Sequence, residues 1–127
     1  MKFCKNLLIV FATTFFVLVN AQNEVNAEMK VFLSTDDLKV EVINGKILCS
    51  SNIYNLKSEG VYITQVRIDL TINANGRTYS YPNRYFYFDG MYIGAGQRIW
   101  NTFVIYDDSI PNITSGDYNA TTQVWYR

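Results

Sequence analysis

The sequence predicts an all-β protein that folds as an antiparallel β-sandwich of seven or eight short strands. Three observations lead to this prediction. The chain contains ten tyrosines and eight phenylalanines, many of which alternate with polar residues, as is typical of strands with one buried face. Turn signals such as Asn-Gly separate these stretches at roughly ten-residue intervals. No convincing helical pattern accompanies them.

The amino terminus has the pattern of an export signal. Lys2 and Lys5 precede residues 7–19, which carry no charge and are almost entirely apolar. A helix of that length spans about 20 Å, whereas a permanent membrane helix crosses a hydrocarbon core of roughly 30 Å. We therefore expect a cleaved signal peptide and no stable membrane span, with a retained anchor as the alternative.

Cleavage determines what the mature protein contains. Ala27 is the expected cleavage position and Ala21 is the alternative, so residues 1–27 would be the signal peptide and residues 28–127 one secreted domain. The mature part keeps nine basic and ten acidic residues, because two of 11 basic and one of 11 acidic residues leave with the signal. Its net charge near minus one gives no basic face for nucleic acid.

The cysteine count indicates how the domain is stabilised. Of the two cysteines, Cys4 leaves with the signal peptide, so Cys49 has no partner for an internal disulfide. An intermolecular disulfide is one interpretation. The alternation of its strand points Cys49 inward, so we favour a small buried side chain.

The first strands follow from alternation and from one turn. Residues 29–33 are expected to form an opening edge strand, and residues 38–42 alternate apolar with charged side chains. Asn44-Gly45 supplies the positive-φ pair of a tight hairpin. The returning strand is expected to point these residues inward: Ile47, Cys49, Ser51 and Ile53.

The longest predicted strand covers residues 61–72. It would span about 40 Å, so a bend or a bulge within it is expected. Its uninterrupted alternation predicts one inward face, made of Tyr62, Thr64, Val66, Ile68, Leu70 and Ile72.

Further turns divide the second half of the chain. Asn75-Gly76 leads into a strand at 77–81, and Pro82-Asn83 is expected to break that strand before another begins at 84–88. Asp89-Gly90 is expected to end the latter. Strands at 98–106 and 117–126 complete the set.

One local motif narrows the predicted fold to an immunoglobulin-like sandwich. Ser115-Gly116-Asp117 leads directly into the last strand, which begins with Tyr118. In such sandwiches a tyrosine near the start of a late strand bonds back to the preceding corner. Tyr118 is therefore predicted to form this structural corner.

The run from Ile93 to Tyr118 carries a resemblance to a known family. With Gly94-Ala95-Gly96-Gln97 before one strand and the tyrosine corner after it, this run resembles the carboxy-terminal half of many bacterial immunoglobulin-like modules, including BsuPI-type proteinase inhibitors. It is also similar to the tail of lipid-binding ML domains, which usually carry paired cysteines that this chain lacks. The resemblance implies a fold and assigns no functional residue.

Composition excludes most catalytic chemistry. The chain has no histidine, which removes the commonest general base and the imidazole metal ligands. We expect no enzyme, no catalytic residue, no cofactor and no metal. Two alternatives stay open: a pair of aspartates for glycoside hydrolysis, and Ca²⁺ held by Asp36-Asp37 together with Asp107-Asp108.

Aromatic residues are in surplus, and some of them must face away from the core. Tyrosines and phenylalanines oppose each other on 84–88, and Trp125 shares a strand face with polar residues. Tyrosine and tryptophan favour interfaces, whereas cross-strand pairing that stabilises the sheet is the alternative. The candidate binding surface consists of Tyr79, Tyr81, Tyr85, Tyr87 and Trp125.

Two asparagines begin sequons for N-linked glycosylation, Asn112 and Asn119.

Taken together, the sequence predicts a secreted, extracellular, non-enzymatic binding module whose partner is a protein or a cell surface. A small-molecule or lipid carrier and a secreted proteinase inhibitor are the alternatives. The oligomeric state is left open.

Overall fold

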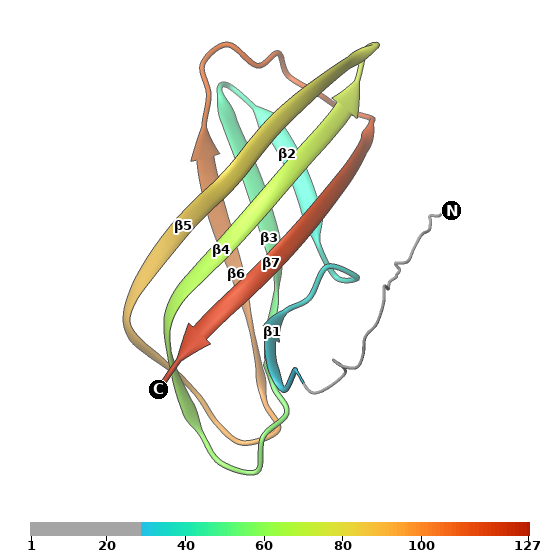
Figure 1. Cartoon of the computed structure of the whole chain (residues 1–127). Helices are drawn as coiled ribbons and strands as arrows, with labels where there is room; N and C mark the ends of the chain where they lie inside the picture. The colour runs from blue at the N-terminus through green and yellow to red at the C-terminus, as the bar shows by residue number, and fades with distance from the viewer. Residues whose placement is uncertain (1–28) are drawn as a thin grey trace.

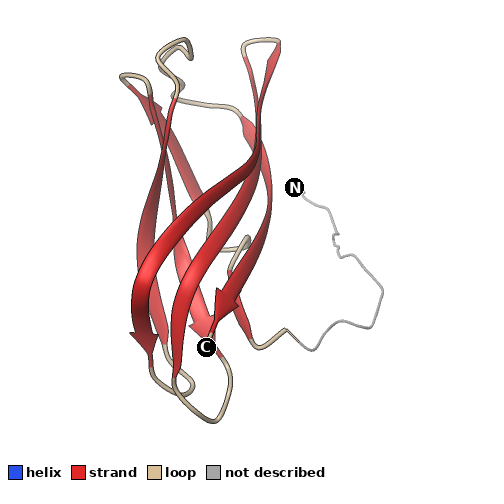
Figure 2. Cartoon of the chain, turned by 60° about the vertical axis from the view of Figure 1, so that its left-hand side comes forward, coloured by secondary structure: helices blue, strands red, loops and turns tan. Residues whose placement is uncertain are grey.

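The computed structural model describes residues 29–127, so the predicted signal peptide lies outside the described residues. This part of the chain folds into strands and loops without a helix, as Figures 1 and 2 show. All strand pairings are antiparallel, as predicted. The strands are β1 (Val31–Leu33), β2 (Lys39–Ile43), β3 (Lys46–Asn55), β4 (Val61–Ala74), β5 (Arg77–Ile93), β6 (Arg98–Tyr106) and β7 (Asp117–Tyr126).

Two sheets face each other. In the first sheet β3 is central: β6 pairs along one side of it, while β2 and then β1 pair along the other. The second sheet has the order β5-β4-β7. The chain therefore crosses between the sheets after β3, after β5 and after β6. Since β4 is the central strand of the second sheet, β7 lies at one edge of that sheet (Figure 1).

Two Asn-Gly turns close hairpins as predicted. Asn44 and Gly45 have φ angles of 52° and 74° and join β2 to β3, and Asn75 and Gly76 have φ angles of 55° and 73° and join β4 to β5. Positive φ at both central residues is the geometry of a type I′ turn, which matches the twist of paired strands.

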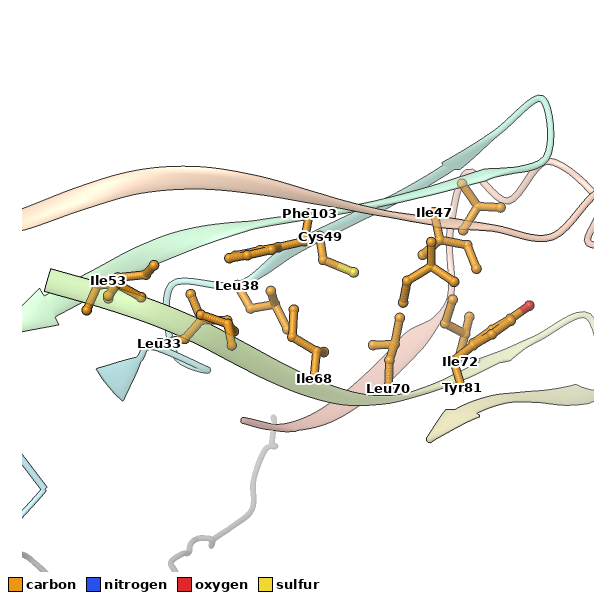
Figure 3. Packing of buried hydrophobic residues seen from close by; sticks show 14 of the residues in the cluster. Leu33, Leu38, Ile47, Cys49, Ile53, Ile68, Leu70, Ile72, Tyr81 and Phe103 are labelled. Carbon is orange, nitrogen blue, oxygen red and sulfur yellow. The ribbon is translucent and has the colours of Figure 1, made fainter. Parts of the chain in front are cut away.

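The core lies between the two sheets, where side chains from both interdigitate (Figure 3). The predicted inward residues of β3 are confirmed, because Ile47, Cys49, Ser51 and Ile53 are fully buried. The Ser51 hydroxyl donates to the Ser34 carbonyl over 2.6 Å, so its burial leaves no orphaned polar group. Burial raises the pKa of the Cys49 thiol to about 12, which makes it an unreactive core residue.

The predicted bulge in the longest strand is present, and it corrects the face assigned to two residues. The register of β4 shifts between Ile63 and Gln65 relative to both neighbouring strands. Because one extra residue inverts the alternation, Val61 and Ile63 are buried, whereas Tyr62 is exposed and Thr64 is partly exposed. The inward assignment of Tyr62 and Thr64 was wrong.

The predicted break at Pro82-Asn83 and the predicted end at Asp89-Gly90 are also wrong, since β5 continues through both. Asn83 and Gly90 have φ angles of 54° and 76° and belong to bulges. The strand continues because β5 lies at a sheet edge, where a proline removes no essential ladder bond. The Asn83 N–H donates instead to the Asp69 carboxylate.

Two further expectations need correction. The opening strand is shorter than predicted, because β1 begins at Val31 and Met29 is exposed outside it. The Tyr118 hydroxyl donates to the carbonyl of Leu38, 2.5 Å away and just before β2 of the opposite sheet, and not to the corner that precedes Tyr118. Tyr118 therefore ties the start of β7 to the segment before β2.

Candidate functional site

The outer face of the β5-β4-β7 sheet carries a group of aromatic side chains. The rings point away from the core because their neighbours along each strand, such as Ile63, Phe86 and Val124, point toward it. Four of the rings are exposed, and Trp125 is partly exposed. We call this group the outer aromatic face; it consists of Tyr62, Tyr85, Tyr87, Tyr92 and Trp125.

Strand register brings three of these rings together. Gln65 of β4 lies opposite both Tyr87 of β5 and Trp125 of β7, and the next outward residue, Arg67, lies opposite Tyr85. The ring centroids of Tyr85 and Tyr87 are 6.4 Å apart with nearly parallel planes, and those of Tyr85 and Trp125 are 6.1 Å apart. The rings therefore contact one another across the central strand.

The other two tyrosines form a second cluster nearer the end of the sheet. The Tyr62 and Tyr92 centroids are 5.1 Å apart, and the Arg127 guanidinium lies 5.2 Å from the Tyr62 centroid. A cation over a tyrosine ring at this distance is an attractive pair.

Two glycines leave room for the side chains of this second cluster. A Cβ atom at Gly60 would lie 2.1 Å from the Tyr92 hydroxyl oxygen, and one at Gly90 would lie 2.8 Å from the Arg127 guanidinium. Any residue other than glycine at position 60 or 90 would therefore compete for space with the side chain of Tyr92 or Arg127.

Polar groups are interspersed among the rings. The Nε of Arg67 lies 3.1 Å from Oδ2 of Asp69, an ion pair that lacks hydrogen-bond geometry. The Thr121 hydroxyl donates to the same carboxylate oxygen over 3.2 Å. Gln65 and Gln123 flank Arg67 and add amide donors and acceptors. The face can thus offer both apolar contact and hydrogen bonds.

Two of the predicted surface residues are not on this face. Tyr81 is only 5% exposed, and its hydroxyl donates to Asp107 Oδ2 over 2.7 Å. Burial, followed by this bond, raises the pKa of Tyr81. Tyr79 is partly buried against the same core. Both point inward because the alternation is inverted at the bulge, so their assignment to the binding surface was wrong.

Two residues of the outer aromatic face were not predicted, Tyr62 and Tyr92. A signal for Tyr62 is present in the sequence: Val61 and Ile63 form one alternating apolar series, and Val66 and Ile68 form another that is out of phase with it. Such a change of phase marks a bulge. For Tyr92 the corresponding change comes at Gly90.

The opposite sheet also exposes aromatic side chains, but they are arranged differently. Trp100 and Tyr106 lie on the edge strand β6, separated by two outward residues, Thr102 and Val104. The Phe32 and Tyr54 rings stack at 5.3 Å on the other part of that sheet. The aromatic residues of this face are spread along it, whereas those of the outer aromatic face are gathered across three adjacent strands.

Two of the carboxylates considered for catalysis or Ca²⁺, Asp37 and Asp107, are engaged locally. Asp37 accepts hydrogen bonds from Tyr54 and Asn52, of which the first chiefly lowers the pKa of Asp37. Asp107 accepts from Ser109 and Tyr81, which lower its pKa in that order. Within residues 29–127, no three Asp, Glu, Cys or His side chains gather where they could hold a metal ion.

Both sequons are on the surface. Asn112 is exposed in the loop after β6, where its Oδ1 accepts the Asn44 N–H over 2.8 Å. Asn119 is exposed on β7.

A shallow depression of about 400 Å³ lies near the β4–β5 turn, between residues 73–78 and 115–116. None of the elements formed by residues 29–127 is a helix long and apolar enough to cross a membrane.

Comparison of the chain with protein-family models, with curated proteins and with solved structures finds no match in any of the three. The resemblance to bacterial immunoglobulin-like modules therefore stays a prediction.

Proposed function

We propose that this protein is a secreted, non-enzymatic recognition module that binds a protein or cell-surface partner through the outer aromatic face. One observation carries the proposal: five aromatic side chains from three adjacent strands gather on the outer side of one sheet. No other element among residues 29–127 covers them. Aromatic rings at a free surface combine large contact area with few rotatable bonds, which is the composition of binding hot spots.

We also propose that the fold is immunoglobulin-like, which strand pairing supports. In immunoglobulin domains the second strand pairs with the fifth in one sheet, and the third pairs with the sixth in the other. Here β3 pairs with β6 and β4 pairs with β7. If β1 and β2 together correspond to the first strand, both pairings match, and β5 corresponds to the extra strand that variable-type domains place beside the third.

The carrier alternative has less support. A carrier would hold its ligand between the two sheets, but that space is occupied by buried side chains from both sheets (Figure 3). The depression near the β4–β5 turn is open to solvent and lined largely by polar residues. No feature of the loops within residues 29–127 favours the proteinase-inhibitor alternative.

The proposal is tested by comparing two tyrosines of equal exposure on opposite sheets. Tyr87 in the outer aromatic face is 74% exposed, and Tyr106 on β6 is 73% exposed. We expect fluorescently labelled protein to bind cells of the producing organism, Tyr87→Ser to weaken this binding at least about tenfold, as hot-spot loss does, and Tyr106→Ser to leave it unchanged. Flow cytometry with a titration of labelled protein measures the effect.

Equal loss of cell binding in both variants, or no loss in either, would contradict the role of the outer aromatic face.

Secretion is tested separately by the mass of the protein recovered from the culture medium. A chain that begins at Glu28, or at Gln22, would support export with cleavage, and an intact Met1 would contradict it.

A further inference from the structure

The outer edge of β7 carries a row of backbone groups that pair with no strand formed by residues 29–127. Within residues 29–127, β7 pairs with β4 alone, and Figure 1 shows it at the margin of its sheet. Arg127 exchanges two backbone hydrogen bonds with Tyr62 of β4, each of 2.9 Å, so the backbone groups of Arg127 point toward β4. Since backbone groups alternate between the two sides of a strand, those of every second residue from 118 to 126 point away from β4.

The first sheet approaches β7 through side chains and leaves this edge open. The Thr122 hydroxyl donates to the Leu33 carbonyl over 2.9 Å, and the Tyr118 hydroxyl donates to the Leu38 carbonyl. These bonds run from the inward face of β7 to β1 and to the segment before β2. The backbone N–H and C=O groups of the edge take no part in them.

Other edges of the two sheets are protected against pairing with another strand. Along β5, Pro82 lacks an N–H, and the bulges at Asn83 and Gly90 interrupt a regular edge. β2 has five residues and carries Lys39 and Glu41. Charges, prolines, bulges and short length are the usual means of preventing edge pairing. β7 has none of them between its first residue, Asp117, and Arg127.

The strand β6 is also a regular edge, but its inward side chains are better covered than those of β7. Phe103 and Ile105 of β6 are buried, whereas the inward residues of β7 remain partly open to solvent: Tyr118 is 41% exposed and Tyr126 is 43% exposed. A strand added beside β7 would therefore bury apolar surface as well as complete a hydrogen-bond ladder.

We propose that β7 pairs antiparallel with β7 of a second copy of this chain, about a two-fold axis at Thr122. The two three-stranded sheets would become one continuous sheet. In this register the residues whose backbone groups point outward lie opposite one another, and each such pair exchanges two hydrogen bonds. Inward side chains meet inward ones, as the two-residue period of a strand requires.

Charge complementarity selects this register and this occupant. With Thr122 opposite itself, Asp117 of each copy lies opposite Arg127 of the other, so the two ends of the paired strands carry opposite charges. Shifting the register by two residues keeps the faces matched but loses both charge pairs and shortens the ladder. Opposite charges across a strand pair stabilise the pairing.

The pairing would also place two copies of the outer aromatic face on one sheet. Trp125 of each copy would lie opposite Asn119 of the other. A partner with repeated epitopes, such as a cell surface, would then be engaged by two linked sites, which raises the overall affinity without new contacts. The self-association itself does not depend on the proposed function.

A pair of double variants at exposed positions tests the dimer. Thr121 of one copy would lie opposite Gln123 of the other, so Thr121→Lys with Gln123→Lys sets like charges against each other, and Thr121→Lys with Gln123→Glu sets opposite charges. In sedimentation equilibrium of the processed full-length protein, we expect a wild-type dimer, a dissociation constant at least about tenfold higher for the first variant, and a retained dimer for the second.

Hydrogen exchange measured by NMR identifies the strand involved. We expect the amides of Ala120, Thr122 and Val124 to be protected in the dimer and to exchange quickly in the Lys/Lys variant, while those of Thr121 and Gln123, which face β4, stay protected in both. A wild-type monomer at millimolar concentration would overturn the proposal, as would a dimer that is equally stable in both variants. Protected edge amides in a monomer would instead show that another segment of the same chain occupies the edge.

Discussion

The two halves of β5 carry the same pattern of alternating aromatic residues and place it in opposite ways. Before the bulge at Asn83, the tyrosines Tyr79 and Tyr81 point into the core; after it, Phe86 and Phe88 point inward, and Tyr85 and Tyr87 point outward. The extra residue in the bulge inverts the alternation. Aromatic alternation therefore identifies a strand, but the phase breaks decide which rings are available for binding.

The chemistry of the rings agrees with their placement. Tyr81 can be buried because Asp107 accepts its hydroxyl, whereas Phe86 and Phe88 pack against Phe103 and need no polar partner. Tyr85 and Tyr87 keep their hydroxyls on the outer side of the sheet. Substitutions on either side of the bulge test whether burial distinguishes the two sets of rings.

The largest effect is expected for Phe86→Ala. Its ring lies 4.9 Å from the Phe103 ring at the contact between the two sheets. Its removal should lower the free energy of unfolding by about 3 kcal/mol, measured by urea denaturation. Tyr85→Ala, one position away on the outer face, is the control and should cost far less. Equal losses would mean that the two faces of β5 are not distinguished by burial.

Tyr81→Phe should have the next largest effect. It keeps the buried ring and removes only the hydroxyl that donates to Asp107. We expect a loss of about 1 to 2 kcal/mol in the free energy of unfolding. Tyr87→Phe removes a hydroxyl from an exposed ring and should change nothing measurable. An unchanged stability of Tyr81→Phe would show that the hydroxyl is equally well satisfied in the unfolded chain.

The same bond predicts how the effect depends on pH. Hydrogen bonds from Ser109 and then from Tyr81 lower the pKa of Asp107 below its usual value of 3.8. A carboxyl with a lowered pKa stabilises the fold above that usual value, and this contribution is lost as the pH falls through the folded-state pKa. Wild-type stability should therefore fall more steeply than that of Tyr81→Phe as the pH drops below about 4. Parallel curves would contradict the coupling.

Asn83→Ala tests the bulge itself. Asn83 has a φ angle of 54°, which alanine tolerates poorly, so we expect a loss of about 1 kcal/mol in the free energy of unfolding. Asn83→Gly is the matched control, because glycine adopts positive φ freely and the N–H that donates to Asp69 is kept. If alanine and glycine behave alike, backbone strain does not determine the position of the bulge.

Much of the fold could be predicted because its signals are local. The turns at Asn44-Gly45 and Asn75-Gly76 and the strands β6 and β7 follow from residues that adjoin them, and the structure has them where they were predicted. Pro82 misled the prediction because a proline ends a central strand but not an edge strand. Which strands lie at an edge depends on pairing between distant segments, which local residues do not reveal.

The candidate site was predicted only in part for the same reason. Tyr85, Tyr87 and Trp125 were correctly expected to face outward, whereas Tyr81 was not expected to be buried, since its partner Asp107 is 26 residues away. The partner of Tyr118 is farther still: its hydroxyl reaches Leu38 across the core. Hydrogen bonds between sheets of this kind follow from the packed fold and not from strand alternation.

A very small effect on stability is expected for Tyr87→Ser, and its size tests whether the Tyr87 ring stabilises the sheet. Tyr87 stands on the outer face with most of its ring in solvent, so its loss should change the free energy of unfolding by less than about 0.5 kcal/mol. Tyr106→Ser, equally exposed on the opposite sheet, is the control. If Tyr87→Ser alone costs much more, the ring stabilises the sheet through Tyr85, and cross-strand pairing rather than binding explains the outer aromatic face.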